Sequence, residues 1–164
     1  MDGRLIAIYL NDHLPGATGG LELARRALGA NRGTPFEAPL ARLAAEIEED
    51  RATLLDVMRR LEVARDPLKE AAAWLAEKAG RAKLNGRIAG YSPYSRVLEL
   101  EVLALGVEGK RALWRALAHV AADDARLAGL DLAALTRRAE GQRRLIERQR
   151  LRAAEIAFGA SGPN

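Results

Sequence analysis

The residues from 36 to 61 carry an apolar pattern that strongly limits how this part of the chain can fold. An apolar side chain recurs at every third or fourth position, at Phe36, Leu40, Leu43, Ile47, Leu54, Val57 and Leu61. This alternation of four and three residues is typical of the buried seam of a helix in a bundle. Asp50 occupies one inward position of the seam. Because a buried carboxylate is costly unless another group pairs with it, the pattern also predicts a polar partner for Asp50.

The preceding stretch offers His13 as that partner. It has a seam of the same spacing, at Ile6, Tyr9, His13, Gly16, Gly20, Leu23 and Ala27. In a short-looped antiparallel helical hairpin with Leu28 near Phe36, position 13 faces position 50. We therefore predict a buried polar pair of His13 and Asp50.

This pair has two interpretations. A carboxylate that holds an imidazole occurs in general-base sites and beside metal ligands. The same contact can also simply fix the register of two helices. The structural interpretation is favoured, because the sequence shows no serine nucleophile or oxyanion-hole signature beside the pair. Gly16 and Gly20 on the same face indicate either close approach of two helices or a small ligand cavity, and close approach is favoured.

Five helices are predicted, over residues 4–28, 36–63, 66–84, 92–122 and 131–158. Ser92-Pro93 and Asp131 are typical helix-capping signals at the last two starts. The four longer helices form two hairpins, and the 66–84 helix lies in a connection that crosses the bundle. We expect one domain over residues 1–158 and a flexible tail over 159–164.

The chain resembles the ferritin-like superfamily in three features: two long hairpins, a crossover between them, and the acidic run Glu46-Ile47-Glu48-Glu49-Asp50 midway along a bundle helix. The resemblance implies an all-α, ferritin-like four-helix bundle. It also implies a di-iron centre held by glutamates and two Glu-x-x-His motifs. This sequence contains no Glu-x-x-His. A divergent iron or manganese site of His13, Asp50 and Glu46, supporting a metal-dependent oxidoreductase, is therefore the alternative hypothesis.

The last predicted helix has polar residues in its seam as well. Its inward positions are Leu132, Leu135, Ala139, Gln142, Ile146, Gln149, Ala153 and Ile156. Two inward glutamines predict a hydrogen-bonded or hydrated middle of the bundle. Gln142 and Gln149, together with His13 and Asp50, are therefore candidates for lining one polar chamber.

Composition narrows the partners and the chemistry. The chain has no cysteine, which excludes disulfides and zinc–thiolate sites. It shows neither a signal-peptide pattern nor a membrane-spanning apolar run, so we expect a cytoplasmic protein without membrane contact. An arginine stripe at Arg137, Arg144, Arg148 and Arg152 is interleaved with glutamates, so nucleic acid is not an expected partner.

The dense apolar stretch 97–107 exceeds what one bundle covers, and it predicts a homodimer. The favoured function is non-enzymatic: a structural or protein-interaction role with no cofactor. The sequence does not identify the protein partner.

Overall fold

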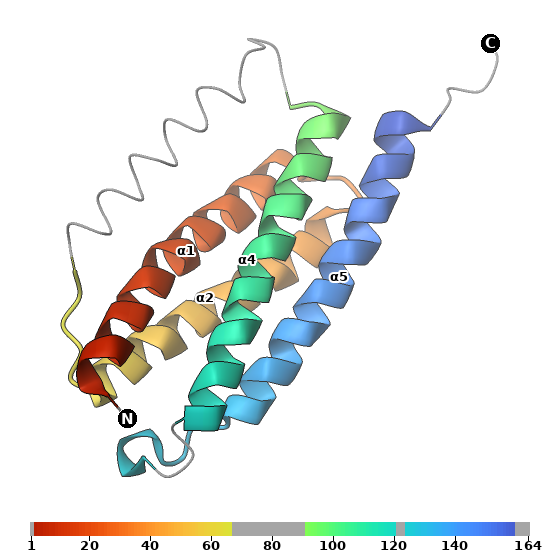
Figure 1. Cartoon of the computed structure of the whole chain (residues 1–164). Helices are drawn as coiled ribbons and strands as arrows, with labels where there is room; N and C mark the ends of the chain where they lie inside the picture. Colours follow the sequence, from red (N-terminus) through yellow and green to blue (C-terminus); the bar gives the residue numbers. More distant parts are fainter. Residues whose placement is uncertain (1, 67–90, 121–123, 160–164) are drawn as a thin grey trace, which may run out of the picture.

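The computed structural model describes residues 2–66, 91–120 and 124–159, and these ranges contain four long helices (Figure 1). The helices are α1 (Gly3–Ala30), α2 (Glu37–Arg60), α4 (Pro93–Val120) and α5 (Leu132–Phe158), with a short 3₁₀ helix, η1, at Ala125–Leu127. No strand occurs in the described ranges, which confirms the all-α prediction. The predicted helix at 66–84 lies outside the described residues apart from Asp66, and the predicted tail lies outside them apart from Gly159.

The four helices pack as two hairpins. α1 packs mainly on α2, and α4 packs mainly on α5, while α1 also contacts α4 and α2 contacts α5 over a short stretch. Figure 1 shows α2 ending beside the N-terminus and α4 beginning at the opposite end of the bundle. The end of α2 and the start of α4 therefore lie at opposite ends of the bundle, whereas the predicted crossing segment lies outside the described residues. No described helix combines the length and apolarity needed to cross a membrane.

Side-chain caps set several helix starts. The Ser92 hydroxyl accepts a hydrogen bond from the Ser95 amide at 3.1 Å, and the Asp131 carboxylate accepts one from the Ala134 amide at 2.7 Å. Both caps were predicted, and they satisfy amides that have no partner within the helix. α2 begins at Glu37, whose carboxylate accepts a hydrogen bond from the Gly33 amide at 2.7 Å.

The buried apolar residues form two clusters, one toward each end of the bundle. The first includes Leu23, Ala27, Phe36, Leu40, Leu43, Ile47, Val97, Leu103 and Ile146. The second includes Leu10, Leu14, Leu54, Val57, Leu113, Trp114 and Leu117. All eight predicted seam positions of α2, Asp50 included, are buried. Asp50 lies between residues of the two clusters along α2, so a polar layer divides the core.

The seam predicted for α1 is wrong at its middle positions, His13, Gly16 and Gly20, which are not buried. The buried residues there are Leu10, Leu14, Leu21 and Ala24, whereas His13 is only half-buried at the edge of this stripe. The α5 seam is buried at Ala139, Gln142, Ile146 and Ala153. Ile156, also predicted to point inward, is 54% exposed near the end of α5.

Asn11 of α1 and Asn31, the residue after α1, hold the chain on either side of residues 67–90. The Asn11 amide donates to the Ala64 carbonyl at 3.0 Å, and the Asn11 carbonyl oxygen accepts from the Asp66 amide at 2.8 Å. The buried Asn31 donates to the Tyr91 hydroxyl at 2.9 Å. The ends of α2 and α4 are therefore both fixed against α1.

The contact at Tyr91 predicts a measurable pH dependence. Burial raises the pKa of Tyr91 from 10.0 to about 12, and the nearby Glu99 acts in the same direction. The hydrogen bond from Asn31 opposes this shift but is outweighed by burial. The folded protein therefore binds the Tyr91 proton more tightly than the unfolded chain does. The resulting contribution to the free energy of unfolding is complete below pH 10 and is lost as the pH rises through 12. Tyrosinate absorbance should show a titration near pH 12 that disappears in Tyr91→Phe. An unchanged titration curve in this variant would contradict the assignment.

Candidate functional site

Asp50 is the centre of a buried hydrogen-bonded cluster that joins three helices. From α4, the Lys110 ammonium donates to one carboxylate oxygen of Asp50 and, at 2.5 Å, to the Gln142 side-chain carbonyl. From α5, Gln142 donates to the same Asp50 oxygen at 3.0 Å, and the Arg138 guanidinium donates to the other. Arg138 also pairs with Glu49 at 2.7 Å. α2, α4 and α5 are thus tied together at mid-bundle.

The charges of this cluster differ in how far they are removed from water. The side chains of Asp50, Lys110 and Arg138 are 2%, 14% and 27% exposed, whereas that of Glu49 is 66% exposed. Burial lowers the pKa of Lys110, and the charge and hydrogen bond of Asp50 oppose this shift. The interior therefore holds one carboxylate between two cationic side chains.

The predicted His13–Asp50 pair is not the contact that the structure shows. Within the described residues, the hydrogen bonds of Asp50 go to Lys110, Arg138 and Gln142. The His13 ring instead packs edge-on against Tyr9, with 4.6 Å between the ring centroids. The difference arises from the hairpin: α1 continues to Ala30 and α2 begins only at Glu37, which shifts the register of facing residues.

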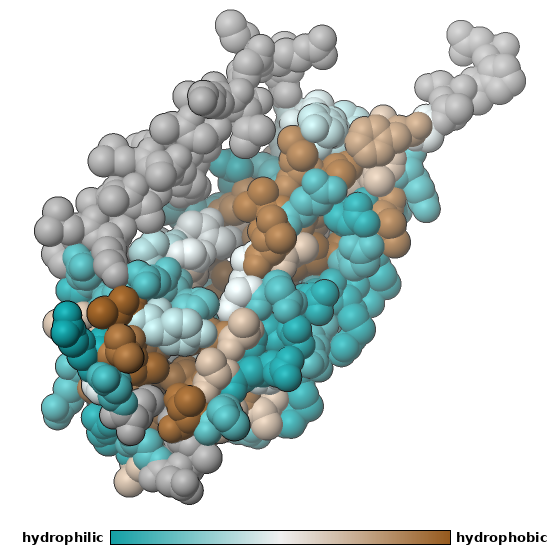
Figure 2. All heavy atoms as spheres, in the orientation of Figure 1, coloured by the Kyte–Doolittle hydropathy of each residue, from teal (hydrophilic) through white to brown (hydrophobic). Residues whose placement is uncertain are grey.

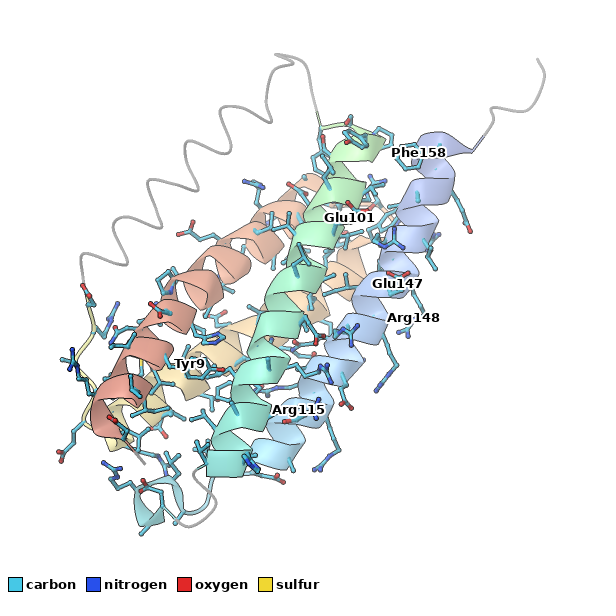
Figure 3. All side chains as sticks on the ribbon, in the orientation of Figure 1. Tyr9, Glu101, Arg115, Glu147, Arg148 and Phe158 are labelled. Atoms are coloured by element: carbon cyan, nitrogen blue, oxygen red, sulfur yellow. The ribbon has the colours of Figure 1, made fainter. Side chains whose placement is uncertain are left out.

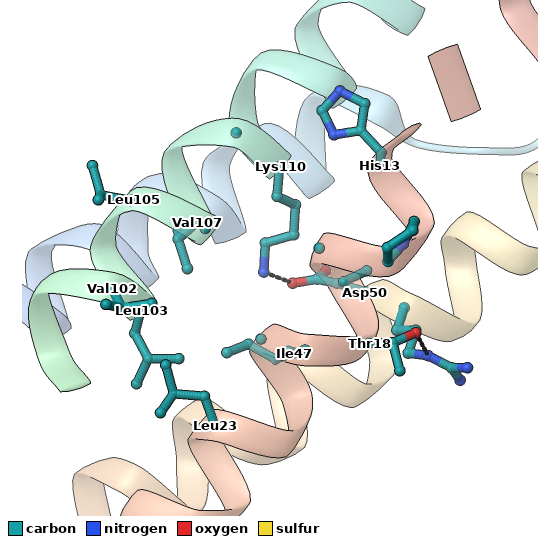
Figure 4. A pocket seen from close by; sticks show the side chains of 18 of the residues that line it. His13, Thr18, Leu23, Ile47, Asp50, Val102, Leu103, Leu105, Val107 and Lys110 are labelled. Carbon is teal, nitrogen blue, oxygen red and sulfur yellow. Dashed lines mark hydrogen bonds and ion pairs between the residues drawn. The ribbon is translucent and has the colours of Figure 1, made fainter. Parts of the chain in front are cut away.

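His13 and Asp50 nevertheless line the same cavity, which lies between α1, α2 and α4 and has a volume of about 900 Å³ (Figure 4). The lining residues fall between Asp12 and Arg26 of α1, between Ile47 and Leu54 of α2, and between Leu98 and Trp114 of α4. Figure 4 shows Lys110 reaching from α4 to Asp50, with Leu103, Val107 and Ile47 to one side and His13 to the other. The cavity is thus mainly apolar, with polar groups near Lys110 and at the end formed by Arg26 and Glu99.

One rim of the cavity is open to solvent along α4. Among its lining residues, Leu105 is 74% exposed and Val102 is 53% exposed. Figure 2 shows hydrophobic side chains gathered over the upper half of α4, beside the hydrophilic surface of α5. A molecule from solution can therefore reach this apolar lining.

Glycines line this cavity without being needed for close packing. Gly16 and Gly20 come from α1, and Gly106 and Gly109 come from α4. A Cβ atom built on any of the four would meet no described atom within 4 Å beyond its own helix backbone and chain neighbours. The preference for close helix approach at Gly16 and Gly20 is therefore wrong, and the alternative, a small ligand cavity, stays a prediction.

The residues proposed to hold a metal do not fit a di-iron centre. Glu46 accepts a hydrogen bond from Arg42 at 2.7 Å, and Asp50 is already engaged by two cationic side chains. His13 is in contact with Tyr9. Among the described residues, no group of three or more histidine, aspartate and glutamate side chains is arranged to hold a metal ion.

The two glutamines predicted to line a polar chamber have different positions. Gln142 is 1% exposed and belongs to the Asp50 cluster. The Gln149 carbonyl oxygen is buried but has no hydrogen-bond partner among the described residues. Gln142 alone therefore joins the polar layer, and Gln149 lies two turns further along α5.

The arginine stripe of α5 lies on the outside of the bundle. Figure 3 shows Arg148 and Glu147 on the outer side of α5, and Glu147 pairs with Arg150 at 2.8 Å. The Arg152 guanidinium lies 5.4 Å from the centre of the Phe36 ring. Two charged side chains of this face therefore have partners within the chain: Glu147 pairs with Arg150, and Arg152 lies over Phe36.

Lys110 and Arg138 are the cluster residues that sequence analysis did not select. A detectable pattern existed for Lys110, because it occupies an inward position of the α4 series Val97, Leu100, Leu103, Val107, Lys110, Trp114 and Leu117. Burial of the apolar members of this series confirms the spacing. Arg138 immediately precedes the buried Ala139 and has no comparable pattern.

Comparisons with known proteins give no further information on this site. No protein-family model, curated protein or solved structure matches the chain. Its function must therefore be argued from the cavity and the buried cluster.

Proposed function

We propose that this chain is a non-enzymatic helical-bundle protein that binds a small, largely apolar ligand in the cavity between α1, α2 and α4. The observation that carries the proposal is the open space beside Gly20 and Gly109, which are partly buried in the cavity lining; Gly16 and Gly106 also border the cavity but are exposed to solvent. A glycine inside a helix costs about 1 kcal/mol relative to alanine. Since close packing does not require a glycine at positions 20 and 109, preserving a cavity is the role that accounts for these two partly buried glycines.

The size and lining of the cavity support the same function. Sites for small molecules commonly enclose about 300–1,000 Å³ and combine apolar walls with a few polar groups. The cavity has a volume of about 900 Å³, and its polar groups include Lys110, Asp50 and His13. Burial lowers the pKa of His13, with Asp12 opposing the shift, which favours a neutral imidazole.

The ferritin-like family, the cytoplasmic location and the homodimer stay predictions. The up-down-down-up order of the helices supports the family resemblance, since it requires a connection along the bundle (Figure 1). The metal-dependent alternative has less support, because Glu46 is paired with Arg42 and Asp50 is paired with Lys110 and Arg138. A ligand-binding role is also compatible with the protein-interaction role favoured by the sequence.

The test is binding of the apolar fluorophore Nile red to the full chain. We expect saturable binding whose Kd rises about tenfold or more in Gly109→Leu. The new side chain occupies part of the cavity, and the apolar contacts that the dye then loses are worth at least ~1.4 kcal/mol. The matched control is Gly141→Leu, on α5 and outside the cavity lining. Absence of saturable binding to the unmodified protein, or equal weakening in both variants, would overturn the proposal.

A further inference from the structure

We infer that the ligand of this cavity is a single-chain amphiphile with a carboxylate head group, a long-chain fatty acid. Its carboxylate would bind at Lys110 and its hydrocarbon chain would lie along the apolar part of the cavity. This inference rests on the proposed function, because it requires the cavity to be a ligand site. The cavity's length, its polarity and its hydrogen-bonding groups each support it.

The cavity is elongated along the bundle. Its lining runs from Asp12 to Arg26 on α1 and from Leu98 to Trp114 on α4. At a rise of 1.5 Å per residue, each of these helix segments is about 20 Å long. A site of this shape suits an extended chain better than a compact ring system.

The polarity of the cavity changes along this length. Leu98, Leu103, Val107 and Ile47 lie on one side of Lys110, and Figure 4 shows His13 on the other. Polar lining residues also occur at the far end, where Arg26 and Glu99 are paired with each other at 3.1 Å. The place for a head group is therefore beside Lys110, with the hydrocarbon chain directed toward Leu103 and Leu98.

The hydrogen-bonding groups near Lys110 favour an acceptor. A lysine ammonium has three N–H donors, and the contacts described for Lys110 go to Asp50 and Gln142. Trp114, one turn further along α4, also lines the cavity. It is 1% exposed, and its indole N–H has no hydrogen-bond partner among the described residues. A carboxylate supplies acceptors for both kinds of donor.

The buried charges favour a negatively charged acceptor. Asp50 is hydrogen-bonded to both Lys110 and Arg138, so these two cations share one carboxylate. Glu49 pairs with Arg138 from the exposed side of the cluster. Glu46 also attracts Lys110, but its carboxylate is hydrogen-bonded to the exposed Arg42. A ligand carboxylate would supply a second anion on the cavity side of Lys110.

The experiment compares hexadecanoic acid with hexadecan-1-ol, both below their aggregation concentrations, as competitors of Nile red on the full chain. The two ligands have equal chain lengths and differ in the charge of the head group. We expect the acid to bind the unmodified protein about tenfold or more tightly than the alcohol, the range of a hydrogen bond to a charged group. Lys110→Met should remove this difference while the alcohol still binds. Arg115→Met, an exposed α4 control, should keep it.

The outcomes separate the inference from the proposed function. Equal binding of acid and alcohol to the unmodified protein would overturn the inference. If Gly109→Leu still weakened Nile red binding in that case, the cavity would remain a ligand site. Absence of saturable Nile red binding would overturn both. The comparison in the unmodified protein requires no variant, so it decides the inference even if Lys110→Met does not fold.

Discussion

Replacing Asp50 by leucine is expected to lower the free energy of unfolding by about 3–5 kcal/mol, the range for removing one partner from a buried ion pair. In this variant Lys110 and Arg138 would lie in the layer without the carboxylate that they share. Arg138 would retain Glu49, whereas Lys110 would retain only the Gln142 carbonyl as a described partner. Urea denaturation of the variant and the unmodified protein measures the difference.

The double variant Asp50→Leu/Lys110→Met should regain much of this loss. An apolar pair of similar size leaves no uncompensated ammonium in the layer, and such replacements are often close to neutral. The matched control is a cycle of Asp50→Leu with His13→Leu. Because His13 and Asp50 share no described hydrogen bond but line the same cavity, their coupling should be weaker than that of Asp50 with Lys110. Stronger coupling of Asp50 to His13 than to Lys110 would contradict the structure.

The success of the sequence analysis at α2 and its failure at α1 have different physical causes. In α2 the inward positions are bulky and apolar except for Asp50, so the spacing alone identifies the buried face. In α1 apolar side chains also occur outside the predicted seam, at Leu10, Leu14 and Leu21. The sequence therefore offers two adjacent helix faces as candidates for the buried face. The structure selects the series that includes these leucines, which places His13 at the edge.

The partner of Asp50 was not predictable from a hairpin argument, because it lies in the other hairpin. Lys110 and Gln142 belong to α4 and α5, which meet the α1–α2 hairpin only after the long connection. Facing residues of a short-looped hairpin follow from loop length, whereas the relative shift of two hairpins depends on packing throughout the bundle. The position of Gln142 in the α5 seam was nevertheless predicted.

The polar layer and the cavity together explain why the core is divided. Glycines on α1 and α4 leave space along the cavity that these helices line. Fixing Asp50 among Lys110, Arg138 and Gln142 links α2, α4 and α5 on the other side of that space. The cluster therefore adds polar contacts between the two hairpins at the level of the cavity.

The combined replacement of Gly16, Gly20, Gly106 and Gly109 by alanine is expected to raise the free energy of unfolding by about 3–4 kcal/mol. Each glycine lies inside a helix, where alanine is more favourable by about 0.8–1.0 kcal/mol. The added methyl groups would meet no described atom within 4 Å outside the local backbone, so no steric penalty offsets this gain. Urea denaturation measures the change in stability, and single variants show whether the four effects add.

The matched control is Gly129→Ala, because Gly129 has a φ of 81°. An alanine in this left-handed region is strained, so the same substitution should there lower the free energy of unfolding by about 1 kcal/mol. The sign of the change at the four helical glycines decides between their two interpretations. Stabilisation would exclude close helix approach as the role of the glycines and is what a binding cavity requires. Destabilisation would mean that the helices need close approach at these positions, and the cavity would then lose its main support.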